Sequence, residues 1–183
     1  MRIYSIVISA SAAVLLCAGC KAQEPPKVSE YKLTSPVRDI MASMVMPNAD
    51  VLWNAVTTNV TARGIEEKAP KTEEEWKSVR SSAVTIMEAG DLILIPGRHV
   101  AAPGEKEQDP NVNLSPEKIE SLINADRSSW VKMAHDLHDS ILPALKAIDA
   151  KDAKALSDAG AGIDKACEDC HLKYWYPKDA AKQ

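Results

Sequence analysis

The chain has 183 residues, a length that suits one domain with a real core and is short for two domains. It contains 22 Lys and Arg residues against 26 Asp and Glu residues, which gives a formal net charge of −4. This weak negative charge argues against nucleic-acid binding, because phosphate recognition depends on a basic surface.

The first 19 residues have the pattern of an export signal. Arg2 supplies a basic start, an apolar stretch covers residues 6–16, and two small residues precede Cys20. The apolar stretch is too short for a normal transmembrane helix. We therefore predict a signal peptide at residues 1–19 and an exported protein.

The segment that ends at Cys20 resembles the lipobox of bacterial lipoproteins, in which the cysteine becomes the lipidated first residue of the mature chain. Cys17 stands where that pattern prefers Leu. The resemblance implies lipid on Cys20 and a periplasmic location at a bacterial membrane; the alternatives are ordinary cleavage nearby and an uncleaved N-terminal anchor. Residues 20–34 are polar and contain Pro25 and Pro26, which predicts a flexible tether.

The first predicted helix follows the tether. Ser35 as N-cap and Pro36 at the first helical position open it, and apolar residues then recur at helical spacing up to Ala55. Pro47 lies inside this pattern and lacks an amide donor, so the helix must kink or restart there.

The second predicted helix opens with a capping box formed by Thr72 and Glu75 and should end before Pro96. Residues 96–116 contain four prolines and two glycines. This connection is longer than most, so it is either a cover for a functional site or mobile. No convincing strand pattern is present, and the short apolar run at 91–95 is interpreted as the end of the second helix.

Two further helices complete the predicted body. Residues 115–117 can open a short helical lead-in, and a clear helical pattern follows at 130–148, with a bend expected at Pro143. A last helix is predicted from Asp152 to Tyr174. Together they predict an all-α fold, an antiparallel four-helix bundle. Its predicted limits are residues 35–177, with a tail at 178–183.

The motif with chemical content is Cys167-Glu168-Asp169-Cys170-His171, the CxxCH arrangement of c-type haem attachment. On a helix the two thiols share one face, where each can form a thioether with a haem vinyl group, and the next residue brings an imidazole to the iron. The motif therefore predicts one covalent haem c near the C-terminal end of the last helix, held by Cys167 and Cys170 and ligated by His171.

The cysteine pair has three other interpretations. A small structural disulfide is one, and a thioredoxin-like pair is another, although the latter requires an αβ fold that the sequence does not indicate. A zinc site needs four ligands, and no second pair at zinc-finger spacing is found. His135 and His138, with Asp136 and Asp139 beside them, are interpreted as a solvated helix flank rather than a metal site. His99 is a minor candidate for a distal iron ligand.

A CxxCH motif near the end of the last of four helices resembles the cytochrome c prime family of four-helix-bundle haem proteins. The specific part is Ala166 to Trp175, with weaker support from Val37-Arg38-Asp39-Ile40-Met41. The long connection at 96–116 departs from compact members of the family. The resemblance implies that the first helix covers the distal side of the haem, so that Met41 or, less favourably, Met44 is the sixth ligand and Arg38 contacts a propionate. The alternative is that both methionines fill the core.

Two functions share these proximal residues. The first is electron transfer in the periplasm with a redox partner protein; the second is binding of a small gas such as nitric oxide at an open sixth position. A peroxidase would need polar acid–base groups on the distal side, whereas the first helix offers mainly methionines and aliphatics, so we expect no enzymatic activity. The family resemblance also suggests a homodimer.

Overall fold

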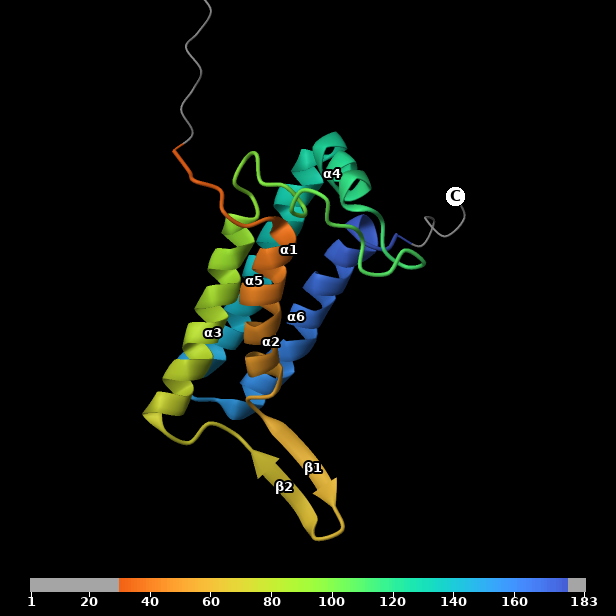
Figure 1. Cartoon of the computed structure of the whole chain (residues 1–183). Helices are drawn as coiled ribbons and strands as arrows, with labels where there is room; N and C mark the ends of the chain where they lie inside the picture. The colour runs from red at the N-terminus through yellow and green to blue at the C-terminus, as the bar shows by residue number, and fades with distance from the viewer. Residues whose placement is uncertain (1–29, 178–183) are drawn as a thin grey trace, which may run out of the picture. The chain divides into compact units, whose positions relative to one another are not determined.

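The computed structural model describes residues 30–177. The predicted signal peptide, Cys20, most of the predicted tether and the predicted tail at 178–183 lie outside these residues. The described part is mainly helical, with one small antiparallel sheet (Figure 1). None of its helices is both long enough and apolar enough to cross a membrane.

The first helical segment consists of three consecutive elements: α1 (Val37–Ile40), the π-helical turn η1 (Met41–Val45) and α2 (Met46–Trp53). Helix α1 begins one residue later than predicted, and no side chain caps it. Instead the amides of Val37 and Arg38 donate to the carbonyls of His99 and Val100, at 2.9 and 3.1 Å. The long connection therefore satisfies the first donors of this helix.

The predicted interruption at Pro47 takes the form of a wide turn. Pro47 has no N–H to donate to the carbonyl four residues earlier, and the preceding turn is π-helical, with the Met46 amide donating to the Met41 carbonyl. The Asn48 side chain donates to the Met44 carbonyl at 2.7 Å. These two bonds satisfy carbonyls in the turn, so the chain continues as α2 without a break.

Strands β1 (Thr57–Thr61) and β2 (Gly64–Lys68) form a hairpin that the sequence reasoning missed. Gly64 has φ +124° and follows a turn through Ala62 and Arg63, and the Thr61 hydroxyl donates to the Gly64 carbonyl. A glycine at this place accommodates a backbone conformation that other residues rarely adopt. The expectation of a chain without strands was therefore wrong for this segment.

Helix α3 (Glu73–Leu92) confirms the predicted capping box: the Thr72 hydroxyl accepts from the Glu75 amide, and the Glu75 carboxylate accepts from the Thr72 amide. The connection that follows is held by hydrogen bonds. The Arg98 guanidinium donates to the carbonyls of Leu92 and Ser35, and the Leu114 amide donates to the Trp175 carbonyl at 2.8 Å. These bonds fix both of its ends to the helices.

Helices α4 (Pro116–Ala125), α5 (Arg127–Asp149) and α6 (Ala153–Tyr174) follow. Each has an N-cap side chain that accepts an amide hydrogen bond: Ser115, Asp126 and Asp152, respectively. Helix α5 runs through Pro143 as one helix. The short lead-in predicted at 115–117 is the start of α4, a separate helix of ten residues.

The hydrophobic core lies between the long helices. Helix α5 packs against both α3 and α6, and α2 packs against α3 and α6 (Figure 1). The most deeply buried large side chains include Ile86, Trp130, Ile141, Ile163 and Tyr174. This packing brings the turn η1 and the C-terminal part of α6 to a common cavity.

Candidate functional site

Helix α6 carries Cys167, Cys170 and His171, and all three side chains line one cavity of about 190 Å³. Their spacing of three and four residues places them on one face of the helix. The two cysteines are free thiols and half-buried. The three residues of the predicted attachment motif therefore line one cavity.

The remaining walls of this apolar cavity come from four other segments. Helix α2 and the turn η1 contribute methionines, small aliphatic residues and a tryptophan, and α5 contributes a second apolar wall. The lining residues outside α6 are Met41, Val45, Met46, Ala49, Trp53, Ile93, Met133, Ala134 and Leu137. A flat apolar group can be enclosed here with its surface removed from water.

A polar groove of about 400 Å³ adjoins the apolar cavity. The two share Met41, Met46 and His171. The other groove residues are mostly polar or aromatic: Arg38, Asp39, Ala42, Glu105, Gln108, Asn113, Trp175 and Tyr176. The combined site is amphipathic, because its inner part is apolar and its outer part carries charges and amides.

The thiols are kept protonated by their surroundings. Burial, reinforced by the nearby Asp164 carboxylate, raises the pKa of Cys167 to about 11. Burial, together with the neighbouring Cys167, raises the pKa of Cys170 to about 12. A thioredoxin-like nucleophilic cysteine needs a lowered pKa, so these values argue against that interpretation of the pair.

The His171 imidazole has the opposite shift. Burial lowers its pKa, and the Glu168 carboxylate opposes this effect only in part. The ring is therefore neutral at neutral pH, which leaves one nitrogen with a free lone pair. A neutral imidazole facing an apolar cavity is suited to bind a transition metal.

The π-helical turn decides which methionines face the cavity. Met41 and Met46 are five residues apart, which is the hydrogen-bonding period of a π turn, and both line the cavity. Met44 does not line it, although it packs on the core. Met46 is 53% exposed because it also lines the polar groove. Sequence reasoning therefore missed Met46, since an α-helical spacing pairs Met41 with Met44.

Arg38, the predicted propionate contact, is one of the residues that line the polar groove. Its Nη1 donates to the Lys106 carbonyl at 2.7 Å and lies 3.9 Å from the Glu105 carboxylate. The Glu105 carboxylate also accepts from the Ala102 amide at 3.0 Å. The long connection is thus anchored to the guanidinium at the mouth of the site.

The C-terminal end of α6 packs around His171. The amides of Trp175 and Tyr176 both donate to the His171 carbonyl, at 2.8 and 3.0 Å, and both rings lie 5.8 Å from the imidazole, centroid to centroid. The Tyr176 hydroxyl donates to the Glu168 carboxylate at 2.7 Å. Tyr176 was not singled out from the sequence; its place directly after the motif was the available signal.

Trp53 lines the cavity, and its Nε1 donates to the Gly160 carbonyl of α6 at 3.3 Å. A Cβ at Gly160 would lie 3.3 Å from Trp53 Cδ1. The absence of a side chain at position 160 therefore allows the indole to approach α6 closely.

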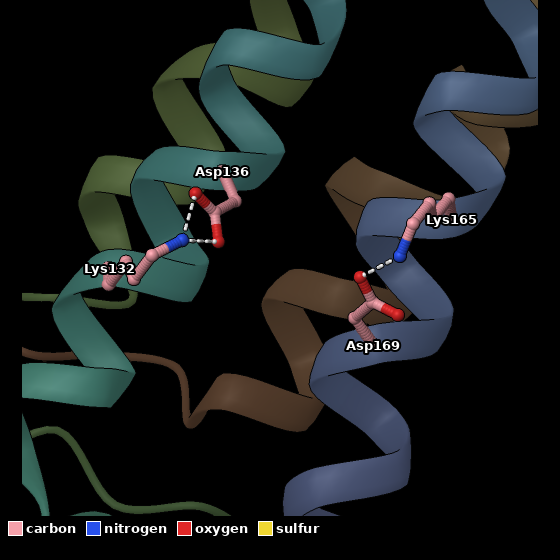
Figure 2. A network of polar contacts seen from close by, with 4 residues as sticks. All are labelled: Lys132, Asp136, Lys165 and Asp169. Carbon is pink, nitrogen blue, oxygen red and sulfur yellow. Dashed lines mark hydrogen bonds and ion pairs between the residues drawn. The ribbon is translucent and has the colours of Figure 1, made fainter.

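The other histidines lie away from the cavity lining. His99 pairs with Glu120 at 3.0 Å and its side chain is 72% exposed, and His138 pairs with Asp139 at 3.0 Å. Figure 2 shows the ion pairs of the helix flanks, Lys132 with Asp136 on α5 and Lys165 with Asp169 on α6. Within residues 30–177, no three His, Cys, Asp or Glu side chains gather as a metal site would require.

Comparisons with models of protein families, with curated proteins and with solved structures gave no match for this chain.

Proposed function

We propose that this chain is a c-type cytochrome with one covalent haem c, built as a four-helix bundle of the cytochrome c prime kind. The observation that supports the proposal is the single apolar cavity lined by Cys167, Cys170 and His171. The cavity and the polar groove beside it match the two parts of a haem: the cavity suits the apolar ring, and the groove suits the charged propionates. The residues present therefore fit a haem.

Cys167 and Cys170 would hold the group through two thioethers, and their protonated thiols suit this attachment, because adding an S–H across a vinyl group consumes no oxidant. The neutral imidazole of His171 would bind the iron. To bind a propionate, the Arg38 guanidinium would either give up its hydrogen bond to the Lys106 carbonyl or use its remaining N–H groups.

The bound group would supply a one-electron redox couple, and the chain's own residues adapt the site to electron transfer. Met41 and Met46 line the same cavity as His171 and offer two thioether side chains to it. A thioether as sixth ligand suits iron in a redox carrier. The apolar walls exclude water, which limits rearrangement between the two oxidation states. The redox partner would be a protein that docks at the polar groove.

Gas binding is the second candidate function, and one observation favours it. The part of the cavity wall formed by η1 and α2 also contains Val45 and Ala49, and neither side chain offers a donor or an acidic proton. If both methionines stay away from the iron, this wall would admit a small neutral molecule such as nitric oxide and exclude anions. The part of the wall formed by η1 and α2 has no acid–base group, which disfavours a peroxidase; the carboxylates that line the cavity, Asp164 and Glu168, lie on α6 with the attachment motif.

The experiment is the visible absorption spectrum of the protein matured in a host with haem-attachment machinery, recorded oxidised, reduced, and reduced with carbon monoxide. A low-spin spectrum that is indifferent to carbon monoxide would support electron transfer. A high-spin spectrum that shifts with the gas would support gas binding. If denatured protein carried no covalent haem, the proposal would be wrong.

The matched variants are His171→Ala and His135→Ala. The first should keep the thioether-bound haem but lose the native ligation spectrum, and the second should change neither, because His135 lies on an exposed flank.

Periplasmic export with lipid on Cys20 belongs to the same proposal. Mass spectrometry of the mature N-terminus tests it, since ordinary cleavage would leave an unmodified cysteine.

A further inference from the structure

The two acidic residues inside the attachment motif lie in different surroundings, and the proposed function uses neither. Glu168 lines the cavity together with His171, which follows three residues later on the same face of α6. Asp169 is not among the residues that line the cavity. It pairs with Lys165, one turn earlier on the helix, at 2.5 Å, and its side chain is 52% exposed (Figure 2). Of the two neighbouring carboxylates, only that of Glu168 belongs to the cavity wall.

Tyr176 holds the Glu168 carboxylate beside His171. Its hydroxyl donates to Glu168 Oε2 at 2.7 Å, and its amide donates to the His171 carbonyl at 3.0 Å. Its ring lies 5.8 Å from the imidazole, centroid to centroid. A hydrogen bond to a charged acceptor is stronger than one between neutral groups, so it restricts the directions in which the carboxylate can turn. One tyrosine therefore contacts the imidazole and fixes the carboxylate.

The Glu168 carboxylate favours positive charge on the His171 ring. Burial lowers the pKa of His171, and this carboxylate opposes the effect. The other carboxylate that lines the cavity belongs to Asp164, seven residues before His171, which is about 10.5 Å along a helix axis. Glu168 is about 4.5 Å away by the same measure. Because the interaction of two charges weakens with distance, Glu168 has the stronger effect on a charge at the imidazole.

We infer that Glu168 stabilises the oxidised form of an iron bound by His171 and so lowers its reduction potential, and that Tyr176 is the positioning residue for this carboxylate. The inference rests on the proposed function. Loss of one electron adds a positive charge at the iron, and a fixed negative charge nearby favours the more positive state. Groups around an axial ligand are one of the means by which a protein sets the potential of a haem.

A redox titration of the full-length, haem-loaded protein, followed by visible absorption, compares Glu168→Gln with its matched control Asp169→Asn. Each substitution removes one negative charge from the motif and keeps the size of the side chain. At a fixed ambient potential, Glu168→Gln should raise the ratio of reduced to oxidised protein at least about threefold, which is about 28 mV for a one-electron couple. Asp169→Asn should change the ratio clearly less, because its carboxylate is paired with Lys165 and exposed to screening by salt.

Tyr176→Phe tests the positioning role, because it removes the hydroxyl and keeps the ring and the amide. Without the hydroxyl the carboxylate can turn towards water, so the potential should rise part of the way towards that of Glu168→Gln. In a Glu168→Gln background the same substitution should have no further effect, since no charge is left to position. A merely structural role of Tyr176 would shift the potential in both backgrounds. Circular dichroism checks that every variant is folded.

The outcomes separate this inference from the proposed function. Denatured parent protein without covalent haem would contradict the proposed function and overturn the inference with it. With haem attached, equal shifts in Glu168→Gln and Asp169→Asn, or an unchanged or lowered potential in Glu168→Gln, would overturn the inference alone. A Tyr176→Phe shift that persists in the Glu168→Gln background would overturn the positioning role. If Glu168→Gln does not fold, Tyr176→Phe decides by itself, and an unchanged or lowered potential overturns the inference.

Discussion

Two glycines of α6 differ in a way that makes the packing of Trp53 measurable. A Cβ added at Gly160 would lie 3.3 Å from Trp53 Cδ1, whereas a Cβ added at Gly162 would meet nothing within 4 Å. Both positions lie inside the same helix. The substitutions Gly160→Ala and Gly162→Ala therefore share their effect on the helix backbone and differ in their effect on the indole.

The magnitudes follow from these contacts. Alanine is favoured over glycine in a helix interior by about 0.8–1.0 kcal/mol. Gly162→Ala should gain this amount in full, which raises the melting temperature by roughly 2–4 °C for a chain of this size. At Gly160 the added methyl group must displace Trp53, and overpacking costs about 1–3 kcal/mol. Gly160→Ala should therefore be neutral or less stable than the parent protein by up to about 2 kcal/mol.

Urea unfolding followed by far-ultraviolet circular dichroism gives both free energies of unfolding. The same two substitutions in a Trp53→Ala background complete a double-mutant cycle. Without the indole, Gly160→Ala should stabilise the protein as much as Gly162→Ala does. If the two alanine variants are already equally stabilised with Trp53 present, the close contact between α6 and the indole is not a constraint, and the reasoning fails.

Three further predictions concern the helices and the core. Thr72→Ala removes the acceptor of the Glu75 amide and should lower the free energy of unfolding by about 1 kcal/mol, measured by urea unfolding; an unchanged midpoint would contradict the capping role. Ile141→Ala removes a fully buried side chain and should cost about 2–5 kcal/mol, whereas Leu142→Ala, at a side chain 45% exposed, should cost much less. Hydrogen bonds from Ser129, followed by those from Lys173 and Ser128, lower the pKa of Asp126 in the folded state, so its stabilising effect is present above the unfolded value near 3.8 and is lost as the pH falls further. In Asp126→Asn the free energy of unfolding should therefore fall less steeply as the pH drops below that value, as measured by urea unfolding at a series of pH values. If the free energy of unfolding depended on pH equally in variant and parent, this prediction would be refuted.

The helices were largely predictable because their ends carry local chemistry. The capping box at Thr72 and Glu75 depends on residues three apart, and the structure shows both of its hydrogen bonds. The hairpin was not predictable in the same way. A strand with one buried face alternates apolar and polar residues, whereas β1 and β2 have no buried face, so Val60 and Ile65 stand alone among polar residues. Its turn also lacks the Asn-Gly or Asp-Gly pair that marks the commonest hairpins.

The candidate site likewise has a part that was predictable from the sequence and a part that was not. Cys167, Cys170 and His171 belong to one contiguous motif on one regular helix, so their common face follows from α-helical geometry. The opposite wall depends on a turn that is not α-helical. Pro47 removes one amide donor, the turn before it widens to the π period, and Met46 then shares the cavity with Met41 while Met44 does not line it. A proline that follows a methionine-rich helical stretch thus carries information about side-chain direction, because one missing hydrogen bond changes which thioethers line the cavity.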